Sequence, residues 1–166
     1  MNWKRVFRHL VFPPTRVGRV FPARALDAIE QAIRTCEDSH QGEIRFAVEG
    51  AIGLVPLLKG ISARQRAIEV FSTLRVWDTE SNNGVLVYLL LADRKVEIVA
   101  DRGVHRLAGS TAWVAICHDM ENAFRQGRFE EGAIGGIRAI AACLAAYYPA
   151  NGSAKRNELP DRPVVL

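Results

Sequence analysis

The sequence is poor in long hydrophobic runs and in cysteine, and each shortage narrows the class of protein. Outside the expected strands, its longest apolar stretch, 133–148, is interrupted by Arg138 and is shorter than the roughly 20 residues that span a bilayer. The N-terminal residues mix basic side chains with apolar ones, a pattern not typical of a secretory signal peptide. The three cysteines, Cys36, Cys117 and Cys143, lack CxxC spacing and fall on helical patterns, which indicates buried free thiols. We therefore expect a soluble protein of the cytoplasm, where thiols stay reduced.

Motifs that mark a familiar reaction are also missing. The chain contains no GxGxxG, GxxxxGK[ST] or GxSxG motif, so the usual nucleotide-binding and hydrolase signatures give no support for those activities. The histidines lie far apart and show no HxxxH spacing, so the sequence indicates neither a histidine metal site nor a histidine base. The sequence thus predicts a fold without naming a reaction.

Acidic residues are absent from the first 24 positions, which carry six basic ones. The rest of the chain has slightly more acidic than basic side chains, so the isoelectric point of about 9.2 reflects the N-terminal segment. The body shows no cationic stripe with interleaved aromatic residues, and we do not expect it to bind nucleic acid.

Residues 1–21 form a basic amphipathic arm. Its apolar residues repeat at helical spacing and are Trp3, Val6, Phe7, Leu10 and Val11. Two interpretations stay open. In the first, the arm contacts a membrane surface or an acidic partner, which requires apolar residues on one face and cations around them. In the second, it folds back onto the domain and its apolar face fills a groove.

Hydrophobic spacing predicts helices and strands along the rest of the chain. The predicted helices cover 22–39, 62–74, 111–125 and 129–148. The segment 85–92 is apolar almost throughout and is bounded by turn residues, as in a strand that is covered on both faces. The segments 43–49 and 95–101 alternate apolar and polar residues, so each is expected to be a strand with one polar face.

The order of these elements predicts an α/β fold, a three-layer α/β/α sandwich around a small mixed sheet. A strand, a helix and a second strand form a right-handed crossover, so 43–49 should run parallel to 85–92. A tight turn at Asp93 and Arg94 should then pair 85–92 with 95–101 in a central hairpin, with Asp101 opposite Leu86. We expect three parts: the arm 1–21, a domain over 22–149 and a flexible tail over 150–166.

The hairpin returns Asp101 to the loop that precedes the central strand. There it joins polar residues of that loop in an oxygen-rich group that we call the rim: Asp78, Glu80, Asn82, Asn83 and Asp101. Glu43, at the start of its own strand, is expected at the same end of the sheet. Carboxylate and amide oxygens are the ligands that calcium and magnesium prefer, so the rim is a candidate site for either ion.

A purely structural role is the alternative for the same residues. Asp and Asn before a strand commonly accept or donate hydrogen bonds to nearby backbone groups and so stabilise turns. An EF-hand is excluded, because Leu89 stands where the bidentate Glu of that loop is needed. The choice between turn caps and a metal site stays open at the level of the sequence.

Three segments together resemble the TPM domain family. They are Asn82-Asn83-Gly84 with the strand and turn after it, Ala100 to Gly103, and Phe124 to Gly132, and the resemblance covers roughly 21–148. The resemblance implies an α/β/α sandwich and, as in some members, a site for calcium or another divalent ion beside an Asp-Asn-Gly motif. Here Asn82 replaces the usual Asp of that motif, whereas Asp101 adds a carboxylate from across the hairpin.

The resemblance and the rim together lead to two hypotheses about function. The first is a cytoplasmic binding or assembly module that uses the rim, with or without a metal, to hold an unknown protein partner. The alternative is a weak metal-dependent hydrolase similar to the acid phosphatase for which the family is partly named. In that case the cation polarises a phosphoryl oxygen and positions a water molecule.

Overall fold

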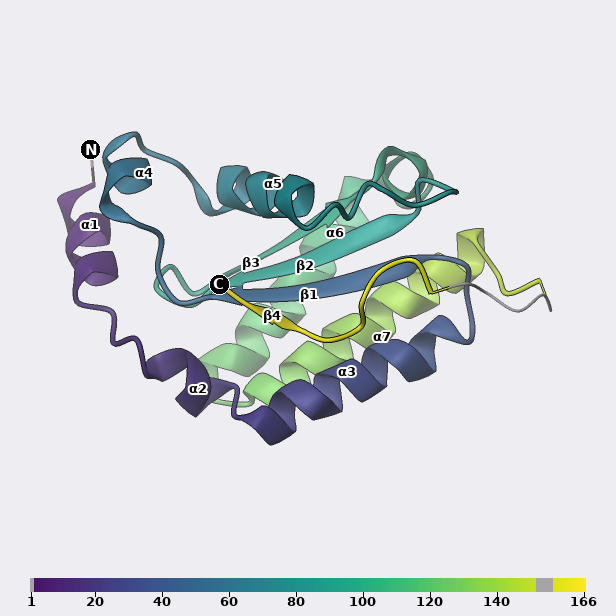
Figure 1. The fold of residues 1–166 in the computed structure, drawn as a ribbon, viewed down its shortest axis with the longest axis horizontal. Coiled ribbons are helices and arrows are strands. Elements are labelled where there is room, and N and C mark those ends of the chain that lie inside the picture. Colours follow the sequence, from purple (N-terminus) through teal and green to yellow (C-terminus); the bar gives the residue numbers. More distant parts are fainter. Residues whose placement is uncertain (1, 152–156) are drawn as a thin grey trace.

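The computed structural model describes residues 2–151 and 157–166 (Figure 1). In chain order the elements are α1 (Trp3–Leu10), α2 (Arg16–Val20), α3 (Ala23–Glu37), β1 (Glu43–Glu49), α4 (Leu54–Leu58), α5 (Ala63–Thr73), β2 (Gly84–Leu90), β3 (Lys95–Ala100), α6 (Arg102–Arg125), α7 (Phe129–Tyr147) and β4 (Val164–Val165). Residues 1 and 152–156, which belong to the expected arm and tail, lie outside the described residues.

The strands form one mixed sheet in the order β3-β2-β1-β4. β1 and β2 are parallel, with Glu43 opposite Gly84, and β2 and β3 are antiparallel, with Val85 opposite Ala100. β2 therefore lies between β1 and β3, and all of its residues are buried, as its apolar run predicted. The parallel crossover and the hairpin are both confirmed.

Helices cover the two faces of the sheet and complete the predicted α/β/α sandwich (Figure 1). Alternate residues of β2 enter different cores because successive side chains of a strand point to opposite faces. Val85, Val87 and Leu89 pack with α3, α6 and α7. Leu86, Tyr88 and Leu90 pack with α5 on the other face.

Local sequence signals explain where two of these helices begin or bend. α5 opens with a capping box, in which Ser62 Oγ accepts from the Gln65 amide and the Gln65 side chain accepts from the Ser62 amide. α6 begins directly after Asp101 and therefore starts earlier than the helix predicted over 111–125. Its two parts meet at Gly109, whose φ of 72° is a conformation that glycine adopts at little cost.

The end of the chain differs from the expected tail. Its described part, 157–166, runs along β1, and β4 pairs in parallel with Ala47 and Val48. Leu159 and Asp161 are buried there. The polar face predicted for β1 is therefore covered, because Glu43 Oε2 accepts from the Leu159 amide at 3.2 Å and Arg45 donates to backbone carbonyls of the same segment.

The N-terminal arm folds back onto the domain through its polar face. Asp93, in the turn between β2 and β3, accepts hydrogen bonds from Arg5, Arg8 and His9 of α1. The apolar face is divided: Val6 is buried in the core on the α5 side of the sheet, whereas Trp3, Phe7, Leu10 and Val11 remain exposed, Trp3 at 65% of its possible exposure. Within the described ranges, α1 included, no helix has both the length and the apolar character needed to cross a membrane.

Candidate functional site

The rim lies at the end of the sheet where β1 and β2 begin and β3 ends, on the right in Figure 1. The Asp101 amide donates to the Gly84 carbonyl at 2.9 Å, so the hairpin does return Asp101 to the loop before β2. Asp101 lies level with Gly84 and not opposite Leu86. The shift arises because the turn between β2 and β3 spans four residues, 91–94, and Arg94 closes it with a φ of 53°.

Gly103 brings the start of α6 close to the same loop. A Cβ at this position would lie 2.6 Å from the Asn82 carbonyl oxygen and 2.7 Å from the Tyr148 hydroxyl. Only glycine allows this approach without movement of the backbone, which holds Asn82 beside the N-terminus of α6.

Asp101 caps α6 with one oxygen and leaves the other unsatisfied. Asp101 is the N-cap residue of α6, and its Oδ1 accepts from the amide of Arg102, the first residue of the helix, at 2.6 Å. Its Oδ2 is buried and has no hydrogen-bond partner anywhere in 2–151 or 157–166. Burial of such an oxygen without a partner costs free energy, so this atom marks a place where a ligand that brings positive charge or a donor would be stabilised.

Asn83 is the second residue with an unsatisfied oxygen. Its side chain is 1% exposed, and its Nδ2 donates to the Gln41 carbonyl at 2.8 Å. Its backbone amide donates to Thr79 Oγ1 at 3.1 Å. Its Oδ1 finds no partner in the described part of the chain. Asn83 therefore acts as a structural bridge between two loops and also offers a free amide oxygen.

The other two acidic residues of the rim do not join this group. Asp78 and Glu80 are exposed, and neither lines the pocket that contains Asp101. Their backbone amides serve the local fold, since Asp78 donates to the Arg75 carbonyl and Glu80 to a carboxylate oxygen of Glu158. Within the described ranges, no group of three or more His, Cys, Asp or Glu side chains is placed to hold a metal ion.

A pocket of about 460 Å³, the rim pocket, opens beside Asp101. Its polar wall holds Asn82, Asp101 and Arg102, and its apolar wall comes from α5 and the loop after it. Trp77 and Ile68 of that apolar wall are each about half exposed. Sequence analysis missed Trp77, because only the packing of α5 against β3 brings it to Asp101. Apolar walls with a few convergent polar groups are typical of binding sites.

Comparison with known families identifies this architecture. The model of the TPM domain matches residues 18–143. The chain belongs to the TPM domain family. No curated protein sequence matches this TPM domain. The match to the family model spans the rim, the hairpin and the connection between α6 and α7, which are the segments that carry the sequence resemblance.

Solved structures similar to this TPM domain agree with that assignment. The BA42 protein of the psychrophilic bacterium Bizionia argentinensis is 29% identical, covers 88% of this chain and 95% of its own, and has a TM-score of 0.77. The N-terminal domain of a P. gingivalis protein is 18% identical over 86% of this chain and 95% of its own, with a TM-score of 0.63. The N-terminal domain of cg2496 from Corynebacterium glutamicum is 13% identical over 81% and 78%, with a TM-score of 0.56. The last two share the fold.

Proposed function

We propose that this TPM domain is a binding module whose rim pocket receives a cationic or hydrogen-bond-donating group at Asp101. The buried, unsatisfied Oδ2 of Asp101 carries this proposal. Leaving a buried polar atom without a partner costs about 1–3 kcal/mol, and more if the group is charged, so a ligand that satisfies it gains affinity. The apolar wall with Trp77 gives a partner a surface to cover next to that contact.

A calcium or magnesium ion is the first ligand to test. Asp101 Oδ2, at the pocket, is a hard oxygen donor without a partner in the described part of the chain, and such donors suit both ions. Asn83 Oδ1 is a second unsatisfied oxygen of the rim, although Asn83 does not line the pocket. With one carboxylate at the site, the affinity should be low, and Asp78 and Glu80 should contribute nothing. A bound ion would attract a carboxylate or phosphate group of the partner to the pocket.

Thermal unfolding with and without each cation tests this part of the proposal. A ligand that binds the folded state raises the melting temperature. We expect millimolar calcium or magnesium to raise it for the natural protein and for the control Asp78→Asn, which lies outside the pocket. Asp101→Asn should remove the increase while keeping the helix cap, since Asn also caps helices well. If calcium or magnesium raises the melting temperature of Asp101→Asn as much as that of Asp78→Asn, Asp101 is not a ligand of the ion.

We also propose that the exposed apolar residues of α1 bind peripherally to a membrane surface, which is one of the two contacts expected of the arm. The support is an exposed apolar patch on α1 and the neighbouring α4: Trp3, Phe7, Leu10, Val11, Leu54, Val55 and Leu58. Patches of this kind on a folded domain usually mark interaction sites, and Trp favours the membrane interface. Sedimentation with vesicles should weaken in Trp3→Ala/Phe7→Ala and not in the control Leu107→Ala, another exposed apolar residue.

A cytoplasmic location remains part of the proposal. Cys36, Cys117 and Cys143 are free and lie on three different helices, α3, α6 and α7, as suits a reducing compartment. Fractionation of cells that make the tagged protein tests it, and recovery outside the cytoplasm would contradict it.

A further inference from the structure

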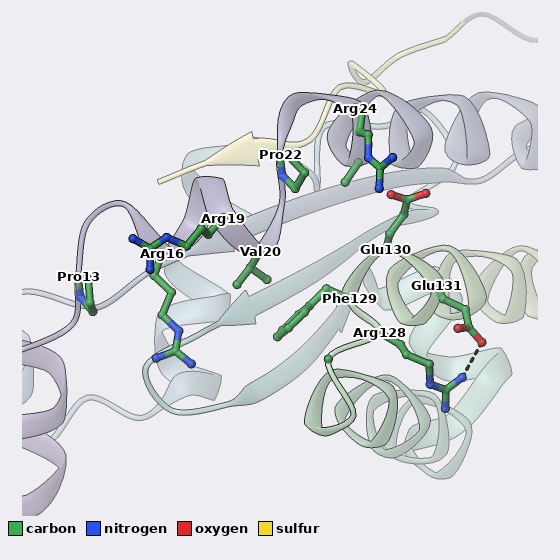
Figure 2. Close-up of a pocket in the computed structure, with 12 residues that line it drawn as sticks. Pro13, Arg16, Arg19, Val20, Pro22, Arg24, Arg128, Phe129, Glu130 and Glu131 are labelled. Atoms are coloured by element: carbon green, nitrogen blue, oxygen red, sulfur yellow. Dashed lines mark hydrogen bonds and ion pairs between the residues drawn. The ribbon is translucent and has the colours of Figure 1, made fainter.

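A second site lies at the end of the sheet opposite the rim. Two adjoining cavities, of about 830 and 470 Å³, share Arg16, Val20, Gly127 and Phe129 in their walls and so form one cleft. It is bounded by α2, the start of α3, the turn after β2 and the connection between α6 and α7. We call it the arginine cleft, because six arginines line it: Arg16, Arg19, Arg24, Arg94, Arg125 and Arg128. Figure 2 shows the larger cavity.

The floor of the cleft is apolar and preformed. Leu89 of β2 and Leu91 of the turn after it line the floor with Phe124 and Phe129. The two phenylalanine rings are stacked, with centroids 5.3 Å apart and planes 15° apart, and Phe21 contacts both edge to face. Such a packed aromatic cluster gives a ligand a rigid surface and needs little reordering on binding.

Several of the guanidinium groups have no carboxylate partner in the described residues. Arg16 lies over the Phe12 ring, 5.8 Å from its centroid, and forms no ion pair; Arg19 and Arg94 form none either. All three are exposed. These three positive charges at the cleft are therefore free for a ligand.

Two of the remaining three arginines are paired with acids. Arg125 pairs with Glu121 at 3.4 Å, and Arg128 pairs with Glu131 at 2.6 Å, the contact dashed in Figure 2. In the same view Arg24 points towards Glu130, although no ion pair joins them. The cleft lining thus holds six basic and three acidic side chains, a net positive charge. The N-terminus of α3, which has no acidic residue in its first turn, adds to it.

We propose that the arginine cleft binds a phosphate ester with an apolar body. Guanidinium groups match phosphate oxygens in geometry and charge, and several converging ones favour a dianion over a single carboxylate. The apolar body would cover Phe124, Phe129 and Leu89. Each of the two cavities by itself falls within the ~300–1,000 Å³ of small-molecule sites. This proposal is independent of the rim pocket, since none of its residues lines both sites.

Calorimetry on the full chain tests the proposal with octyl phosphate below its micelle concentration. Inorganic phosphate and octanol, each carrying one half of the ligand, should bind at least about tenfold more weakly. Arg16→Gln/Arg19→Gln should weaken octyl phosphate binding about tenfold or more, because it removes two free guanidinium groups from exposed positions. The control Arg106→Gln removes one exposed charge from α6, outside the cleft, and should leave the affinity unchanged.

A second variant and a salt series keep the result decisive. Arg125→Gln, which changes the lining of the smaller cavity, should also weaken binding, and the affinity should fall as the sodium chloride concentration rises. The proposal fails if Arg106→Gln weakens binding as much as the cleft variants. It also fails if the cleft variants bind octyl phosphate with unchanged affinity. A third contradicting result is that inorganic phosphate, or an oligonucleotide compared per phosphate group, binds as tightly as octyl phosphate.

Vesicles distinguish the two sources of this chemistry. Phosphatidylcholine vesicles with phosphatidic acid present the phosphate on a membrane, whereas free octyl phosphate presents it in solution. Loss of vesicle binding in Arg16→Gln/Arg19→Gln supports a lipid headgroup as the ligand. Loss of octyl phosphate binding, with vesicle binding unchanged, supports a soluble phosphate ester and assigns the vesicle contact to α1. If the protein binds neither octyl phosphate nor the vesicles, the proposal is overturned.

Discussion

His9 donates a hydrogen bond from Nε2 to Oδ1 of Asp93 over 3.0 Å and so joins the first helix to the turn between β2 and β3. The tautomer follows from the other ring nitrogen, because His9 Nδ1 accepts from the Ile52 amide at 3.1 Å. Arg5 and Arg8 bond to the same carboxylate. One acidic side chain thus helps to hold α1 against the domain, with Val6 buried and Trp3, Phe7, Leu10 and Val11 left exposed.

Replacement of Asp93 by Asn should therefore loosen the arm. We expect Asp93→Asn to lower the free energy of unfolding by about 2–3 kcal/mol at neutral pH, since charged hydrogen bonds are lost around a buried group. Urea denaturation measures this loss. Arg8→Gln serves as the comparison, because Arg8 is half exposed and its contribution should stay below about 1 kcal/mol. If Asp93→Asn and Arg8→Gln lower the free energy of unfolding equally, Asp93 is not the main residue that holds α1 to the domain.

The same carboxylate predicts a pH dependence of stability. Burial by itself raises the pKa of Asp93, but hydrogen bonds from His9, Arg8 and Arg5 outweigh it and hold the pKa below its ordinary value. A lowered pKa in the folded state contributes stability above the unfolded-state pKa of about 3.9, and that stability is lost as the pH falls through the folded-state value. Unfolding measured between neutral and strongly acidic pH should show this loss, and Asp93→Asn should show less of it.

The last ten residues should contribute to stability. Leu159 is 7% exposed and packs in the core on the α5 side of the sheet, so Leu159→Ala should cost about 2–4 kcal/mol. Thermal or urea unfolding checks this value, with the exposed Leu166→Ala as the control. A negligible effect of Leu159→Ala would mean that the segment carries little of the stability of the fold.

A hydrogen-bonded triad that joins α5 to β1 and β2 should be structural. Tyr88 donates from its hydroxyl to Glu49 Oε2 at 2.6 Å, and Arg66 binds both oxygens of that carboxylate at 2.9 and 3.0 Å. Tyr88→Phe removes one hydrogen bond and leaves the ion pair, so it should cost about 1 kcal/mol. Glu49→Gln should cost more in the same urea experiment, because it removes the charge that Arg66 faces. The reverse order would contradict this arrangement.

The phosphatase hypothesis has a direct test. If the chain is a binding module, purified protein should hydrolyse a generic phosphate monoester no faster than a matched preparation of Asp101→Ala. A chelator should likewise leave any residual rate unchanged. Activity that disappears both on chelation and in Asp101→Ala would instead support the metal-dependent hydrolase. Activity that survives both treatments would indicate a contaminating enzyme.

Part of the candidate site could be predicted because it depends on neighbours in the chain. Two adjacent strands joined by a short turn must return Asp101 to the loop before β2, whatever the rest of the fold does. The helix cap at Asp101 is equally local. Asp78 and Glu80 could not be placed this way, because a loop has no periodicity from which the direction of a side chain follows.

The sequence by itself determined the central strand, the capping box of α5, the parallel crossover and the family, since each depends on residue spacing within a segment or on the order of elements. Only the tertiary structure decided that residues near 164 add a strand to β1 and that Trp77 and Asp101 line one pocket. It also decided that Arg16 and Arg125, far apart in the chain, line one cleft. The physical reason is that such contacts arise from the packing of distant elements, and neither local propensity nor hydrophobic period carries information about which distant surfaces will meet.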